Sequence, residues 1–429
     1  MLSAIIVGAG HRAMLYASYA RKHPDRLRIA GVADPDPIRR EHAISEFGID
    51  HSQVYESAEE LAKQPRQADF VINCTMDHQH VPTAVPLLDA GYHVLLEKPF
   101  ATSEEEMWRL KDAAERNSRE VAICHVLRYA PFYSLIKKKV EEGTLGEILN
   151  LQLTEHVSYH HMSMGYVRGK WRSEEQCHSG MLMAKSCHDL DIMVWMKSHI
   201  RPLHVASFGN NFQFISEKAP SQAGTRCLVD CPIEEDCLYS AKKHFIDHPE
   251  RWSFYVWDSI EHIDEPSIED KIESLKTDNP YGRCVWKCDN DVVDHQSVMV
   301  EFEDGATATL NMVGGCSRPG RSIHLVGTRG ELEGNLESGK FTLRNIDPRP
   351  GHEYEEELFD VNKAGDFSGA AGGHGGGDIG VVEDFVRVLS GESASLSWTG
   401  LQDSVSGHLL GFRAEKARKE RKVIELNYP

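Results

Sequence analysis

The sequence predicts an α/β protein with an N-terminal doubly wound parallel sheet and a C-terminal α+β domain that carries a large, mainly antiparallel open sheet. Up to about residue 124, short apolar runs alternate with helical stretches, a pattern typical of parallel sheets. A glycine turn follows the first apolar run. Beyond residue 128, strand-like segments follow one another with turn residues between them. The change of pattern indicates two differently built sheets.

The length of 429 residues exceeds one usual hydrophobic core, so two domains are expected. We place them at residues 1–124 and 125–429, with a charged, cysteine-containing insertion at 216–290. The net charge of -19 argues against nucleic acid or an anionic membrane as a partner. The first apolar run is too short for a signal peptide and lacks a basic leader, and no later run is long enough to span a bilayer. We therefore expect a cytoplasmic protein.

The N-terminal elements are predicted from apolar runs and helical periodicity. Glutamates crowd the first turn of the last predicted helix, where they suit the positive end of the helix dipole. The predicted strands are 4–7, 27–33, 53–55, 70–74, 93–97 and 121–124, and the predicted helices are 13–22, 37–47, 83–90 and 103–117.

The C-terminal elements are predicted in the same way. Glu303, Asp304 and Gly305 form a candidate hairpin turn between two strands. Residues 346–378 are rich in Pro and Gly and are predicted to form a loop. The predicted strands are 149–156, 203–214, 296–303, 307–312 and 322–327, and the predicted helices are 180–196, 379–389 and 400–418.

The glycine turn has the form Gly8-x-Gly10-x-x-Ala13 between a predicted strand and helix. Gly8 permits a tight turn, Gly10 lets the backbone approach a pyrophosphate, and Ala13 allows close helix–strand packing. Asp34 ends the next strand, where a carboxylate accepts hydrogen bonds from ribose hydroxyls and repels a 2′-phosphate. The pattern predicts a Rossmann domain that prefers NAD. NADP remains an alternative because of Arg39 and Arg40, since an arginine near the ribose can pair with the 2′-phosphate of NADP.

The chain resembles the Gfo/Idh/MocA oxidoreductases over nearly its whole length. The most specific shared motif is Glu97-Lys98-Pro99, which follows an apolar strand. The other shared features are Gly8-Ala9-Gly10, Asp34, Thr75 followed by His80, Arg128-Tyr129-x-Pro131, and His188-x-x-Asp191.

The resemblance implies NAD(P) in the N-terminal domain, a sugar or polyol against the second sheet, and a homodimer or homotetramer. It also suggests that the peptide bond between Lys98 and Pro99 is cis. The predicted cofactor-binding residues are Gly8, Gly10, His11, Arg12, Asp34, Thr75, His80, Glu97 and Lys98.

Oxidation of a secondary alcohol needs a group that stabilises charge on the oxygen and a base that removes the hydroxyl proton. Lys98 is predicted to donate to the substrate oxygen, and His188 is the best candidate base. Asp191, three residues later on a helix, can orient the ring. Inositol dehydrogenase carries an Asp four residues before the catalytic His, but Ala184 stands there in this chain. The adjacent Lys185 is a candidate second cation.

Substrate contacts are predicted in the segment between the first strand of the second domain and the His188 helix. Its aromatic and cationic side chains can stack on a sugar ring or bind a carboxylate, although a polar surface loop fits the pattern equally well. His374, in a glycine-rich loop, is a candidate for closing over the site, although a flexible linker fits this loop equally well. The predicted substrate-binding residues are Tyr159, His160, Arg168, Trp171, Arg172 and His374.

Five of the ten cysteines bracket the insertion. Four thiols in one segment can form a tetrahedral zinc site, although the spacings are not the common C-x2-C pairs. Free thiols, or disulfides in an exported protein, are the alternatives. The candidate metal ligands are Cys227, Cys231, Cys237, Cys284 and Cys288.

Three functions fit these features. The first is an NAD-dependent dehydrogenase that acts on a secondary hydroxyl of a sugar, sugar acid or polyol. The second is a redox-neutral NAD-dependent glycoside hydrolase, in which transient oxidation of a ring hydroxyl permits elimination of the glycosidic bond. The third is a non-catalytic, NAD-binding sugar sensor, against which the presence of Lys98 and His188 argues.

Overall fold

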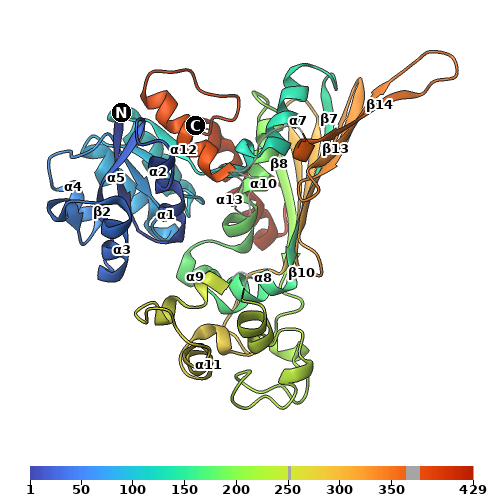
Figure 1. Ribbon diagram of the computed structural model, residues 1–429. Coiled ribbons are helices and arrows are strands. Elements are labelled where there is room, and N and C mark those ends of the chain that lie inside the picture. The colour runs from blue at the N-terminus through green and yellow to red at the C-terminus, as the bar shows by residue number, and fades with distance from the viewer. Residues whose placement is uncertain (250–252, 364–376, 429) are drawn as a thin grey trace.

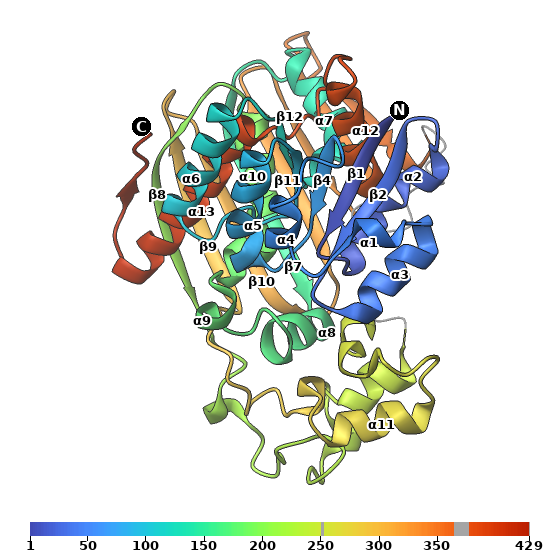
Figure 2. The same ribbon diagram turned by 90° about the vertical axis from the view of Figure 1, so that its left-hand side faces the viewer.

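The computed structural model describes residues 1–249, 253–363 and 377–428. Two sheets organise the chain, a parallel sheet formed by the first part and a larger mixed sheet formed by the second (Figure 1). The predicted fold class is confirmed. Helices lie between the two sheets, and the insertion projects below both of them (Figures 1 and 2).

The first sheet is parallel and has the strand order β3-β2-β1-β4-β5-β6, that of a dinucleotide-binding Rossmann sheet. Side chains alternate between its two buried faces: Ile5 and Val7 enter one core, whereas Ala4 and Ile6 enter another. The strands are β1 (Leu2–Val7), β2 (Leu27–Ala33), β3 (Val54–Tyr55), β4 (Phe70–Asn73), β5 (His93–Leu96) and β6 (Val121–Ile123).

Helices cover both faces of this sheet, and one of them comes from the far end of the chain. Val381 and Phe385 of α12 (Gly377–Leu389) join the core that contains Ala4 and Ile6. The N-terminal layer is therefore completed by a C-terminal helix. The other helices are α1 (His11–Ala17), α2 (Tyr19–Lys22), α3 (Pro37–Phe47), α4 (Ala58–Ala62), α5 (His80–Asp89) and α6 (Glu104–Arg116).

The second sheet has the order β14-β13-β12-β11-β7-β10-β9-β8-β15. Its pairs are antiparallel except for β7 with β10. The predicted hairpin is present, with Gly305 at φ +83 between β9 and β10. The strands are β7 (Ile148–Ser158), β8 (Pro202–Asn210), β9 (His295–Phe302), β10 (Thr307–Cys316), β11 (Gly320–Gly327), β12 (Gly330–Asn335), β13 (Lys340–Ile346), β14 (Tyr354–Asp360) and β15 (Ile424–Glu425).

One loop prediction was wrong in part. Within residues 346–378, Tyr354–Asp360 form strand β14, which pairs with β13. Acidic side chains dominate this strand and lie exposed, so no apolar alternation marks it in the sequence. Arg344 on β13 bonds to Glu356 at 2.7 Å, and such cross-strand ion pairs support the sheet edge.

A layer of helices packs between the two sheets. In α10 (Met181–Met196) nearly every side chain is buried, as expected of a helix enclosed on all sides. It packs against α13 and the second sheet, and it faces the first domain (Figure 2). The remaining helices are α7 (Pro131–Glu141), α8 (Tyr159–His161), α9 (Glu174–Cys177), α11 (Ile268–Lys276) and α13 (Leu401–Glu420).

The insertion is built mainly from short helical turns with one longer helix, α11. Figure 2 shows it beneath α1 and α3 of the first domain and beneath α8 and α9 of the second. Among the described residues, no helix has both the length and the apolar character needed to cross a bilayer.

Candidate active site

The glycine turn joins β1 to α1 at the carboxyl edge of the parallel sheet. Gly8 has φ +78, and a Cβ on it would approach the carbonyl oxygen of Cys74 to 2.9 Å. Only glycine fits that position without strain. A Cβ on Gly10 would meet nothing within 4 Å, so the backbone there borders open space. A turn of this shape fits a dinucleotide whose pyrophosphate approaches the backbone.

Asp34 lies buried at the end of β2, beside this turn. Its carboxylate accepts the backbone N–H of Ala9 at 2.7 Å and the backbone N–H of Asp36 at 2.8 Å. These bonds fix the carboxylate at the place where a ribose would bind, which fits the predicted role. Arg39 bonds to Glu261 of the insertion, and Arg40 donates to the carbonyl oxygen of Asp34 at 2.6 Å.

Glu97 directly follows β5 and is almost completely buried. It accepts hydrogen bonds from Arg12 at 2.7 Å, Tyr16 at 2.8 Å and the backbone N–H of Lys98 at 2.6 Å. Burial favours the neutral acid, but the charges of Arg12 and Lys98 outweigh it and lower the pKa of Glu97 to about 2. Arg12 also pairs with Asp378 at 2.6 Å. Glu97 and Arg12 therefore brace the glycine turn against the strand that carries Lys98.

Thr75 and His80 hold the loops of this edge together. The His80 ring bonds to the carbonyl oxygens of Pro99 at 2.7 Å and Thr75 at 2.9 Å. His80 is 1% exposed, so it lies under the predicted cofactor site and positions its walls. The Thr75 hydroxyl donates to Asn73 at 3.0 Å.

The side chain of Lys98 extends from the edge of the parallel sheet to α10. The peptide bond between Lys98 and Pro99 is cis, as the resemblance implied. The Lys98 ammonium donates to the carbonyl oxygen of Ala184 at 3.2 Å. Ala184 and His188 are four residues apart on one helix and share a face. The structure therefore brings Lys98 and His188 to the same region.

His188 is buried on α10 among other histidines. Its ring lies edge-on to His125, with 5.7 Å between centroids. Both carboxylate oxygens of Asp191 accept from the buried Arg128 guanidinium, at 2.7 and 2.6 Å. Asp191 lies 3.9 Å from Nε2 of His125. Asp191 therefore neutralises the charge of Arg128, a role that the sequence did not reveal. The predicted role of Asp191 in orienting the His188 ring stays a prediction.

Lys185 belongs to a buried charge network that the sequence analysis missed. Its ammonium lies 3.1 Å from Glu155 on β7. Arg321 on β11 contacts both Glu155 at 2.6 Å and Asp189 at 2.9 Å. Burial raises the pKa of Asp189, although Arg321 opposes the shift. The alternation of β7 places Glu155 on its buried face, a signal that was present in the sequence.

The predicted substrate residues that the structure describes have several different neighbours. Trp171 packs near Tyr166 and Tyr255, with centroids 6.1 and 5.6 Å away. Tyr159 and His160 lie on α8, where the His160 ring is 6.2 Å from that of His244 in the insertion. His374 lies outside the described residues.

Arg168 is a correction to the predicted substrate set, and Arg172 of the same set also contacts the insertion. Arg168 is fully buried and donates to the carbonyl oxygens of Arg283 at 2.6 Å and Tyr239 at 2.7 Å, both within the insertion. Arg172 pairs with Asp289 at 2.9 Å. Both arginines therefore anchor the insertion, and Arg168 is not available to a substrate.

His161 is the neighbour that the sequence analysis left out of the site. Burial lowers its pKa well below the usual range, and the charges of Lys185, Arg321 and Lys98 act in the same direction. The charges of these cations therefore act on the His161 ring. Successive residues of a helical turn point about 100° apart, so the sequence did not decide between His160 and His161.

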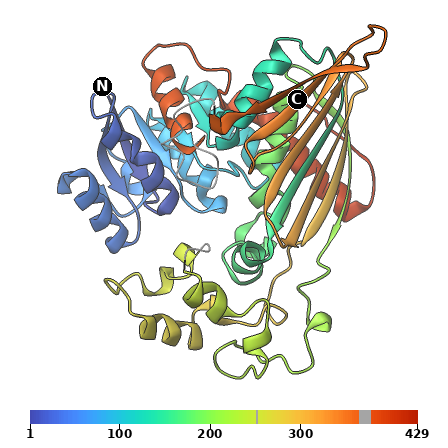
Figure 3. The same cartoon turned by 45° about the vertical axis from the view of Figure 1, so that its right-hand side comes forward.

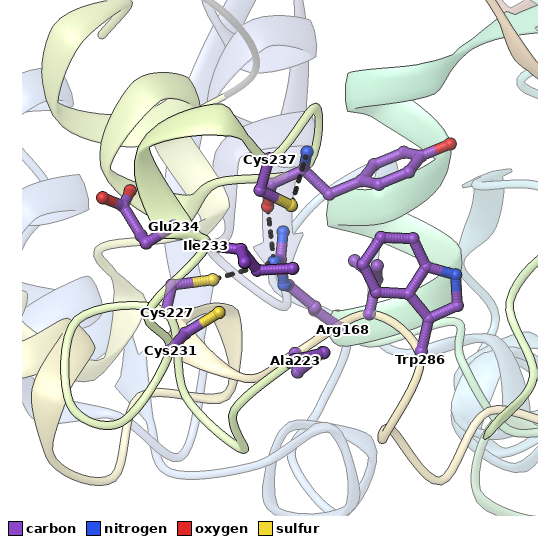
Figure 4. Close-up of a pocket in the computed structure, with 11 residues that line it drawn as sticks. Arg168, Ala223, Cys227, Cys231, Ile233, Glu234, Cys237 and Trp286 are labelled. Carbon is purple, nitrogen blue, oxygen red and sulfur yellow. Dashed lines mark hydrogen bonds between the residues drawn. The ribbon is translucent and has the colours of Figure 1, made fainter. Parts of the chain in front are cut away.

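The zinc prediction is not supported. Across residues 1–249, 253–363 and 377–428, no group of three or more His, Cys, Asp or Glu side chains is arranged to hold a metal ion. Figure 4 shows Arg168 entering the cluster, where it donates to Cys227 Sγ at 3.4 Å. A guanidinium there disfavours a second cation. The cavity beside it is only about 10 Å³, and its cysteine lining comprises Cys227, Cys231, Cys237 and Cys284, whereas Cys288 lies on the same segment as Cys284.

This arrangement fits a protein that binds a dinucleotide at the carboxyl edge of its parallel sheet. Residues 2–125 match the oxidoreductase family with an NAD-binding Rossmann fold. This part of the chain therefore carries the NAD-binding domain of the Gfo/Idh/MocA oxidoreductases.

Comparisons with individual proteins agree with this assignment. The chain is 24% identical to oxidoreductase YteT of Bacillus subtilis, over 90% of this chain and 88% of that protein. It is 27% identical to a glycosyl hydrolase family 109 protein of Phocaeicola vulgatus, but spans only 53% of that relative. A levoglucosan dehydrogenase in complex with NADH and levoglucosan shares the fold, with a TM-score of 0.71, 16% identity and 100% coverage of both chains.

Proposed function

We propose that the protein is an NAD-dependent dehydrogenase that removes a hydride from a secondary hydroxyl of a sugar, sugar acid or polyol. The observation that carries the proposal is the Lys98 ammonium at the carbonyl oxygen of Ala184, one helical turn from His188. A cation and an imidazole on one wall can serve the same hydroxyl group.

The residues present fit a nicotinamide dinucleotide, because the glycine turn is open and Asp34 is fixed beside it. Such a cofactor supplies a hydride acceptor. Lys98 donates a hydrogen bond to the substrate oxygen and stabilises the negative charge that develops on it. His188 accepts the hydroxyl proton. Glu97 accepts a hydrogen bond from the backbone N–H of Lys98, which fixes the backbone from which the Lys98 side chain extends.

The charge network of Lys185, Glu155, Arg321 and Asp189 positions one wall of the site. Its two basic and two acidic groups lie within 3.1 Å of a partner and are nearly excluded from water. Strong pairing of this kind fixes side chains that would otherwise be mobile. We assign Lys185 to substrate orientation from this wall.

A redox-neutral glycosidase is the second candidate. Ala184 occupies the position of the carboxylate that the inositol dehydrogenase pattern carries, so no side chain acid stands there. The family 109 relative, over the part that matches, supports this alternative. In it, transient oxidation of a ring hydroxyl would acidify a neighbouring C–H, and the aglycone would leave by elimination. Water would then add to the resulting double bond, and return of the hydride would reduce the carbonyl. The oxidation state of the sugar is unchanged overall.

The test uses a panel of sugars, polyols and aryl glycosides with purified protein and NAD. NADH absorbance and aglycone release are followed in the same cuvette. NADH that accumulates with free sugars supports the dehydrogenase and names its substrate class. Aglycone release without net NADH supports the glycosidase, and the absence of both with the whole panel would refute each activity.

A further inference from the structure

The insertion reaches the edge of the parallel sheet where the predicted cofactor site lies. Glu261, directly after the short turn η9 (Asp258–Ile260), bonds to Arg39 in the first turn of α3. The short turn η8 (Ser253–Tyr255) precedes η9, and α3 follows β2 directly, so its first turn marks the carboxyl edge of the sheet. Figures 2 and 3 both show the insertion below this edge.

At the adenosine end, Glu261 and Arg39 form an ion pair. The Arg39 guanidinium donates to both Glu261 oxygens, at 3.2 and 3.3 Å through Nη2 and at 3.4 Å through Nε. Both side chains are about one-third exposed, so water and salt reach the pair. Arg39 follows Asp34 closely in the chain, and the charge of Asp34 acts on it. The ion pair therefore stands beside the carboxylate predicted to hold the ribose.

Toward the glycine turn, charges of this segment and of the first domain act on one another. Burial raises the pKa of Tyr255 to about 12, and the charges of Arg12 and Glu97 also act on it. Burial lowers the pKa of His11, and the charge of Asp258 opposes this shift. The direct contact of the segment with the Rossmann domain is thus the Glu261–Arg39 ion pair, and its electrostatic influence extends to the glycine turn.

Contacts with the second domain hold this segment in place. Lys170 bonds to Asp258 at 2.6 Å, and its ammonium lies 5.1 Å above the Tyr255 ring. The Tyr255 ring packs edge-on against Trp171. Lys170 and Trp171 follow the long turn Met162–Arg168, whose Arg168 anchors the insertion. The segment is therefore held by Lys170 and Trp171 on one side, and on the other side its Glu261 pairs with Arg39 of the Rossmann domain.

We propose that residues 253–261 form a cap over the dinucleotide site, latched by Glu261 and Arg39, which slows the release of bound nucleotide. The inference rests on the proposed function, since it presupposes that the site holds NAD. The cap slows exchange because release requires the segment to separate from the Rossmann domain. It also makes Arg39 unavailable to a 2′-phosphate while Glu261 occupies it.

The experiment measures nucleotide release directly. Wild-type protein is loaded with NADH and mixed with a large excess of NAD, and the loss of bound NADH fluorescence gives the dissociation rate. Glu261→Arg sets two cations against each other, and we expect release roughly tenfold faster, because interface changes act mainly on dissociation rates. The double variant Arg39→Glu/Glu261→Arg restores the opposite charges and should return toward the wild-type rate. Glu269→Gln, an exposed change in the same insertion, should release NADH as the wild type does.

Salt provides an independent readout, since exposed ion pairs weaken as ionic strength rises. Release from the wild type should accelerate with salt, whereas release from Glu261→Gln should respond less. The measurement uses Glu261→Arg protein whose melting temperature matches that of the wild type. If this variant binds NADH tightly and releases it at the wild-type rate, the cap proposal is wrong and the proposed function is unaffected. Failure of the wild type to bind NAD or NADH would overturn both.

Discussion

Glu97 offers a direct test of how the cofactor edge is held together. Its carboxylate is buried and receives three hydrogen bonds, two of which link it to α1. The pKa falls from 4.5 to about 2, so the folded state favours the ionised form by about 3 kcal/mol. Because the folded pKa lies below the unfolded one, this contribution is complete above about pH 4.5 and is lost as the pH falls toward 2.

Glu97→Gln keeps the shape of the side chain and removes its charge. We expect the free energy of unfolding at pH 7 to be about 3 kcal/mol lower than in the wild type. On going from pH 7 to pH 4, the free energy of unfolding of the variant should fall by about 0.8 kcal/mol less than that of the wild type. Urea denaturation of nucleotide-free protein at both pH values measures this. Glu105→Gln, an exposed change on α6, is the matched control. If Glu97→Gln unfolds like this control at both pH values, the ion pair does not support the fold.

Three further substitutions test the site. Lys98→Met should lower turnover by about 10²- to 10³-fold, and NADH binding measured by fluorescence titration should persist. His188→Gln should lose about 10²- to 10⁴-fold in turnover through loss of the base, and unchanged steady-state rates would remove His188 from the mechanism. Asp191→Asn leaves the buried Arg128 guanidinium without its anion. Its cost should be about 3–5 kcal/mol of stability by urea denaturation, and a wild-type midpoint would contradict this assignment.

The parallel sheet was predictable because its strands are buried on both faces. Such strands appear as continuous apolar runs, as in β1 (Leu2–Val7) and β4 (Phe70–Asn73). Strands β12 to β14 escaped prediction because they form one end of the second sheet and carry charges. Arg344 pairs across strands with Glu331, Glu333 and Glu356, so pairing between neighbours replaces burial there. Cross-strand pairing is not visible in the pattern of one strand.

In the candidate site, the residues that belong to sequence motifs at strand ends were predictable. Gly8, Asp34 and Lys98 all lie at the carboxyl edge because each ends or follows a parallel strand. The partners Glu155 and Arg321 come from strands that are distant in the sequence. Arg168 was misassigned because its cationic residue type fits a substrate site and a buried anchor equally well. Only the fold decides between these environments.

The cap bears on the choice between the two candidate activities. A net dehydrogenase must exchange NADH for NAD in every turnover, so release of NADH sets an upper limit on its rate. A redox-neutral glycosidase returns the hydride within the site and has no such limit. Glu261→Arg should therefore raise the maximal rate of net oxidation if release through the cap is rate-limiting. The same variant should leave aglycone release unchanged, or lower it as nucleotide is lost. A rise in the maximal rate of Glu261→Arg thus identifies a net dehydrogenase even before the natural sugar is identified.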